Sequence, residues 1–186
     1  MKKLLLLGCV FAGATFTASA ASVCPSTSDT NTDCGFIVTI NPGGTISTAA
    51  VPGANPYDGN DDALVGIVNN SGAVFNGSFS LSGSSVDGGI FEFEGDGICT
   101  YVNASYCATA ATGYEGPGVT FSNISSDYST GTINVANLAA GATTYFSLEG
   151  APGNIQGIGT PEPASLSLFG LGAAGAFMFL RKRKAA

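Results

Sequence analysis

Two short acidic segments hold the side chains that are best suited to bind a hard cation. The first places oxygen ligands at Asp58, Asn60 and Asp62, in the D-x-N-x-D spacing that opens a calcium-binding loop. The EF-hand pattern then fails, because Ala63 stands where that loop needs glycine and Asn69 where it needs its closing glutamate. We therefore expect either a shorter calcium loop between strands or a solvated turn, since Asp, Asn and Gly are common turn residues.

The second acidic segment contains Glu92, Glu94 and Asp96, two residues apart from one another. We expect a strand over residues 90–94, in which alternate side chains share a face, so that the three acids would line one side. Like charges placed in this way repel one another unless a cation bridges them or solvent screens them. Calcium binding and ordinary exposure are both open here. A pair of glycosidase carboxylates is a third and weaker alternative.

Tyrosines form a third group with potential for binding, because aromatic faces stack on sugars. The chain has no Trp, so the case for a carbohydrate site is weak and packing explains most of these rings. The six tyrosines are Tyr57, Tyr101, Tyr106, Tyr114, Tyr128 and Tyr145.

The distribution of charge excludes several function classes. All six Lys and Arg residues lie near the two ends, and the chain has no His. Residues 21–160 therefore have no basic side chain, while they carry 12 of the 13 acidic residues. Nucleic-acid binding needs Lys or Arg against phosphates, and Ser-His-Asp or Cys-His catalysis needs an imidazole. We therefore expect no nucleic-acid partner, no catalytic residues and no cofactor other than calcium.

Four cysteines remain between the two ends, and their even number indicates disulfides in an oxidising compartment. Three pairings are possible. Short loop closure favours the local one, in which each bridge would contribute about 2–3 kcal/mol. The residues concerned are Cys24, Cys34, Cys99 and Cys107.

The interior of the chain is typical of an all-β fold. Short runs rich in β-branched and aromatic residues alternate with Gly, Asn, Asp and Ser. We predict an antiparallel β-sandwich, Ig-like or jelly-roll-like, over residues 21–149, with 74–81 as the hairpin partner of 63–69. The expected strands cover residues 36–40, 63–69, 74–81, 90–94, 119–124, 132–136 and 143–148.

Both ends carry targeting signals. Lys2, Lys3, an apolar run and Ala18-Ser19-Ala20 predict a signal-peptide helix over residues 1–20, to be cut by signal peptidase after passage through the Sec machinery. At the other end, a Gly- and Pro-rich spacer is expected over residues 150–160. An uncharged stretch at 164–180 follows, 17 residues long, and predicts a transmembrane helix.

Four basic residues come directly after this stretch: Arg181, Lys182, Arg183 and Lys184. By the positive-inside rule they stay cytoplasmic, so the preceding domain lies outside the membrane. This topology agrees with the signal peptide. The two ends of the chain therefore predict the same orientation independently.

Pro161-Glu162-Pro163, the apolar span and the basic cluster together resemble the PEP-CTERM sorting signal of Gram-negative bacteria, over residues 161–184. The same tail is also called an ice-binding protein C-terminal domain, a name that does not imply ice binding. The resemblance implies that an exosortase recognises Pro161, Glu162 and Pro163 and removes the tail, in a system that accompanies exopolysaccharide production. These three residues are thus an enzyme's substrate.

Residues 56–149 resemble a secreted domain carried on such tails, for which the resemblance implies no activity. We therefore expect a non-enzymatic protein that passes through the inner membrane with its domain in the periplasm. It would then reach the cell surface or the extracellular matrix and associate there with exopolysaccharide. The alternatives are a calcium- or carbohydrate-binding module and, less well supported, a carboxylate-dependent glycan-active enzyme.

Overall fold

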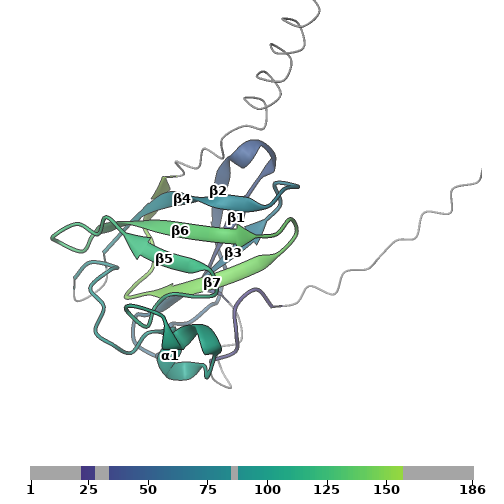
Figure 1. Cartoon of the computed structure of the whole chain (residues 1–186). Helices are drawn as coiled ribbons and strands as arrows, with labels where there is room; N and C mark the ends of the chain where they lie inside the picture. The colour runs from purple at the N-terminus through teal and green to yellow at the C-terminus, as the bar shows by residue number, and fades with distance from the viewer. Residues whose placement is uncertain (1–21, 28–33, 85–87, 157–186) are drawn as a thin grey trace, which may run out of the picture.

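The computed structural model describes residues 22–27, 34–84 and 88–156 (Figure 1). The expected signal peptide, sorting motif, transmembrane span at 164–180 and basic cluster lie outside these residues. Within the part that is described, no helix is both long and apolar enough to cross a membrane. The fold is all-β, as predicted, and is built from two four-stranded sheets with three short helical turns.

The first sheet has the strand order β2-β1-β3-β7, and the second has the order β5-β6-β4-β8 (Figure 1). The strands of the first sheet are β1 (Phe36–Ile40), β2 (Ile46–Ala50), β3 (Ala63–Asn69) and β7 (Thr143–Leu148). Those of the second are β4 (Phe75–Ser82), β5 (Val119–Ser122), β6 (Thr130–Leu138) and β8 (Asn154–Gln156). The helical turns are α1 (Ile98–Tyr101), η1 (Pro42–Gly44) and η2 (Ser105–Ala108).

One hydrophobic core is shared by the two sheets. Its residues alternate along the strands, as expected where one face of each sheet is buried. Strand β3 is buried on both faces, because Val65 and Ile67 join this core while Leu64 joins a second, smaller cluster with Tyr57 and Ile98. The first sheet contributes Val38, Ile40, Val65, Ile67, Phe146 and Leu148, and the second contributes Phe75, Phe79, Leu81, Val119, Ile133 and Val135.

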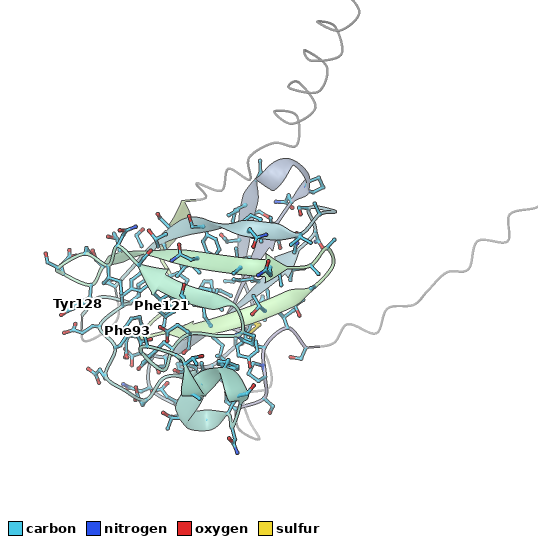
Figure 2. All side chains as sticks on the ribbon, in the orientation of Figure 1. Phe93, Phe121 and Tyr128 are labelled. Atoms are coloured by element: carbon cyan, nitrogen blue, oxygen red, sulfur yellow. A yellow bond between two sulfur atoms is a disulfide. The ribbon has the colours of Figure 1, made fainter. Side chains whose placement is uncertain are left out.

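Aromatic rings tie the segment before α1 to the second sheet. Phe93 stacks on Phe121 of β5 with ring centroids 5.2 Å apart, and the two lie side by side in Figure 2. On its other side Phe93 packs against Tyr114 at 4.6 Å. This packing ties the segment to β5 and to Tyr114.

The prediction of a strand at residues 90–94 is wrong. The segment is a turn, in which the Glu92 backbone N–H donates to the carbonyl of Gly89 at 3.0 Å. Its neighbouring residues Ile90 and Phe91 are both buried, with 0% and 1% of their surface exposed. Both join the one core between the two sheets, whereas a strand would send two adjacent side chains to opposite faces. The apparent alternation with Glu92 and Glu94 therefore does not reflect a sheet face.

The hairpin predicted between residues 63–69 and 74–81 is also wrong, because β3 and β4 lie in different sheets. Asn69 redirects the chain at the end of β3, since its side-chain amide donates to the carbonyls of Ala73, Leu138 and Ala139 at 2.8, 2.8 and 3.1 Å. These bonds hold the corner between the sheets.

One strand pair departs from the expected antiparallel arrangement. Strands β1 and β3 are parallel, and β2 and the loop that follows it form the crossover between them. Strand β8 is a further difference, because it pairs with β4 in a region that the sequence assigns to a spacer.

The four cysteines form the two local disulfides, Cys24–Cys34 and Cys99–Cys107, the pairing that short loop closure favours. The first bridge packs in the smaller cluster against Leu64 of β3. The second bridge joins α1 to η2. These two turns belong to an irregular segment that has few buried residues of its own. Both bridges lie near Tyr145 of β7, which packs against the cluster of the first bridge and contacts the ring of Tyr106, the neighbour of Cys107.

Candidate functional site

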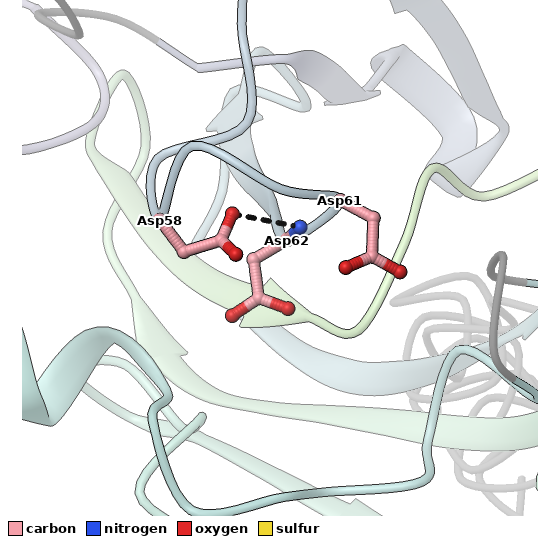
Figure 3. A group of neighbouring side chains, drawn as sticks. All are labelled: Asp58, Asp61 and Asp62. Atoms are coloured by element: carbon pink, nitrogen blue, oxygen red, sulfur yellow. Dashed lines mark hydrogen bonds between the residues drawn. The ribbon is translucent and has the colours of Figure 1, made fainter.

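The acidic loop before β3 is held together by its own hydrogen bonds (Figure 3). The carboxylate of Asp58 accepts from the backbone N–H groups of Asn60 and Asp62, both at 3.1 Å. The side chain of Asn60 is exposed and donates to the Asp61 carboxylate at 2.8 Å. Carboxylate oxygens of Asp58, Asp61 and Asp62 lie within 4.8 Å of one another. The structure therefore groups Asp58 with Asp62 and shows Asn60 turned to Asp61.

The second acidic segment does not form one cluster. Glu92 and Glu94 are exposed, and neither belongs to a group of three acidic residues in the described part of the chain. Asp96 instead meets Asp62, so one residue from each predicted segment comes together. Their third partner is Glu149, which the sequence reasoning did not identify.

Asp62, Asp96 and Glu149 place carboxylate oxygens within 4.8 Å of one another. Asp62 is 1% exposed and Glu149 is 7% exposed, whereas Asp96 is open to solvent. Asp62 immediately precedes β3 and Glu149 immediately follows β7. The adjoining residues Ala63 and Leu148 are partners in the antiparallel pair of these strands. Two strand ends in the first sheet thus set the two buried carboxylates side by side.

Tyr114 lies between two of these carboxylates. Its hydroxyl is within hydrogen-bond distance of Asp96 Oδ1, at 2.6 Å, and of Glu149 Oε1. A phenol has a single proton, so it cannot donate to both carboxylates at once. The Tyr114 backbone is fixed in turn, because its carbonyl accepts from the Ser147 N–H of β7 at 2.9 Å.

Two polar atoms at this cluster are buried without a hydrogen-bond partner, Asp62 Oδ2 and the hydroxyl of Tyr57. Tyr57 is 3% exposed, and its phenol lies close enough to the Asp62 carboxyl for each to affect the pKa of the other, although the two form no hydrogen bond of good geometry. Burial raises the pKa of the Asp62 carboxyl to about 8, and the nearby Glu149 adds to the increase. Burial also raises the pKa of the Tyr57 hydroxyl above its ordinary value. Without a bound cation the Asp62 carboxyl is therefore mostly protonated at pH 7, because burial disfavours its charged form.

Comparison with known proteins bears on the tail of the chain. Residues 160–184 match the family model of the PEP-CTERM protein-sorting motif. The chain carries a PEP-CTERM sorting motif. The predicted motif residues Pro161, Glu162 and Pro163 and the basic residues 181–184 all fall in the matched range. No curated protein and no solved structure matches the chain.

The PEP-CTERM motif indicates an extracellular protein that is sorted by an exosortase. It implies export, a sorting intermediate anchored in a membrane, and display at the surface. The motif confirms the resemblance seen in the tail. The resemblance of residues 56–149 to a secreted domain stays a prediction.

On the domain that the PEP-CTERM motif sorts, two of the described tyrosines present large exposed rings. Tyr101 on α1 is 39% exposed. Tyr128, in the loop before β6, is 44% exposed and is labelled in Figure 2. The others are turned to the interior, as when the hydroxyls of Tyr106 and Tyr145 meet at 3.0 Å. Stacking on a sugar is thus open to Tyr101 and Tyr128.

Proposed function

We propose that the chain is a non-enzymatic component of the cell surface or extracellular matrix that associates with exopolysaccharide. The PEP-CTERM motif at residues 160–184 carries this proposal, because it is a sorting signal. The resemblance of the tail to such signals implies a system that accompanies exopolysaccharide production. The N-terminal signal peptide and the basic cluster at 181–184 support a route through the inner membrane of a Gram-negative bacterium.

The composition of the domain supports a binding or structural role over catalysis. Residues 21–160 contain no His, Lys or Arg, so hydroxyl, amide, carboxylate and backbone groups carry any interaction with a glycan. Two facing four-stranded sheets fit the Ig-like or jelly-roll-like β-sandwich that we propose. Such a domain presents loops and exposed rings, including those of Tyr101 and Tyr128, to a polymer outside the cell.

Processing of the tail is tested by substituting its acidic residue. We expect the wild-type chain to lose the tail, and Glu162→Ala to remain in the membrane fraction at its full mass, because the exosortase reads Pro161-Glu162-Pro163. Cell fractionation followed by intact mass measurement checks this. Asp61→Asn, an acid in the folded domain, is the control and should be processed normally. A tail retained in both wild type and Glu162→Ala would show that this element is not a processing signal.

Association with polysaccharide is tested separately. We expect the exopolysaccharide purified from the producing strain to retain the full chain on a column, and a Tyr101→Ala/Tyr128→Ala variant to elute earlier. Tyr106→Phe, which keeps an interior ring, serves as the matched control. Absence of retention, with and without calcium, would contradict the association. Shortening of the polysaccharide that disappears with Glu92→Gln or Glu94→Gln would instead show the enzymatic alternative.

A further inference from the structure

The cluster of Asp62, Asp96 and Glu149 has no side chain of opposite charge to neutralise it. No Lys, Arg or His occurs in residues 21–160, so no ion pair can form within the domain. Carboxylates that leave water must be paired with a cation, bound to a metal or protonated, because an isolated buried charge is very costly. Glu149 Oε1 accepts from the Glu94 backbone N–H at 2.8 Å, and the single proton of Tyr114 serves either Asp96 or Glu149, but neither donor bonds to Asp62.

A second observation at the same place points to a ligand. Asp62 Oδ2 and the Tyr57 hydroxyl are both buried and lack hydrogen-bond partners. Buried polar atoms in folded proteins nearly always have a partner, so two orphans beside three carboxylates indicate a group that binds them. Tyr57 is not one of the acidic residues, and although its phenol lies beside Asp62 and Ser147, its hydroxyl forms no hydrogen bond of good geometry with either.

The geometry allows one cation to contact all three residues. The three carboxylate oxygens lie no more than 4.8 Å from one another, so an ion with ligand distances of about 2.4 Å, such as calcium, can reach one oxygen of each. The donors are oxygens only, which favours a hard cation over zinc or copper. Asp96 is exposed, so an ion has a path from solvent to the two buried ligands.

We propose that Asp62, Asp96 and Glu149 form a calcium site where the end of β7 meets the start of β3. The ion joins the loop before β3, the loop before α1 and the end of β7, three segments that are far apart in the sequence. Water completes its coordination on the side open to solvent. This site differs from the D-x-N-x-D loop, since it uses Asp62 without Asp58 or Asn60. The proposed calcium site does not depend on how the tail is recognised or removed.

The test uses the full-length chain in detergent, with calcium, magnesium or EDTA. We expect calcium at on the order of 1 mM, the range of extracellular calcium modules, to raise the thermal midpoint above that in EDTA, and magnesium to raise it less. Terbium should luminesce when tyrosine is excited, because Tyr114 contacts two ligands, and calcium should quench this signal by displacement.

Variants locate the ion. Asp96→Asn changes an exposed residue, so it should fold and lose roughly tenfold or more in calcium affinity. Asp62→Asn should lose the calcium response and melt in EDTA at or above the wild type, because it replaces a buried carboxyl whose charged form has no partner when calcium is absent. Asp61→Asn and Glu92→Gln remove nearby acids outside the cluster and should respond to calcium as wild type does.

Two results would overturn the proposal. Equal midpoints in calcium and EDTA, without terbium luminescence, would mean that protons alone neutralise the cluster. Loss of the calcium response in Asp61→Asn, with Asp96→Asn unaffected, would place the ion in the acidic loop. The Glu162→Ala chain should bind calcium normally, so a failure of this site and a failure of the sorting proposal are distinguishable.

Discussion

At the scale of single residues, the Asn69 side chain joins several chain segments through hydrogen bonds. It is fully buried, and its amide group donates to three carbonyls on two chain segments. Its carbonyl oxygen accepts from the backbone N–H and the hydroxyl of Ser71, at 3.0 and 2.6 Å. A polar side chain that satisfies so many buried groups determines how the chain leaves one sheet and enters the other.

We expect Asn69→Ala to destabilise the domain by roughly 3 kcal/mol, because buried carbonyls such as that of Leu138 lose their donor. Urea unfolding followed by circular dichroism measures this loss. Asn103→Ala, at an exposed position, is the matched control and should stay within about 0.5 kcal/mol of wild type. Equal stability of the two variants would mean that the corner is held by the strands alone.

At the scale of elements, the sequence predicted strands where β-branched or aromatic residues are buried. Residues 36–40, 63–69 and 143–148 match β1, β3 and β7, because their inward side chains make a clear hydrophobic pattern. Strand β2 was not predicted, since Ile46–Ala50 lies at a sheet edge and is mostly exposed, with little apolar signal. Residues 90–94 gave a false strand because aromatic packing against β5 produced the alternation.

The candidate site was predictable only in part, for a related reason. Asp62 and Asp96 stand in acidic segments that composition alone picks out, whereas Glu149 is a lone acid at a strand end. Its place in the cluster follows from the pairing of Ala63 with Leu148, a contact between residues far apart in sequence. Periodicity predicts which residues form strands, but it does not specify which strands are neighbours.

At the scale of the whole molecule, charge is divided between the targeting ends and the domain. The six basic residues lie at positions 2, 3 and 181–184, and the 12 acids of residues 21–160 have no opposite partner among them. The domain is therefore under mutual repulsion wherever it is displayed. Cations from solution, whether screening ions or a bound calcium ion, are the available means of reducing that repulsion.

This repulsion predicts an unusual response to salt. In EDTA, raising NaCl from about 0.01 to about 0.15 M shortens the screening distance from about 30 Å to about 8 Å, so the thermal midpoint should rise. Choline chloride should act equally, which separates screening from specific ion binding. Asp61→Asn/Glu92→Gln, which removes two acids outside the proposed calcium cluster, should show a smaller rise than wild type. A midpoint that stays constant or falls over this range would show that the acidic side chains lie too far apart to destabilise the folded domain.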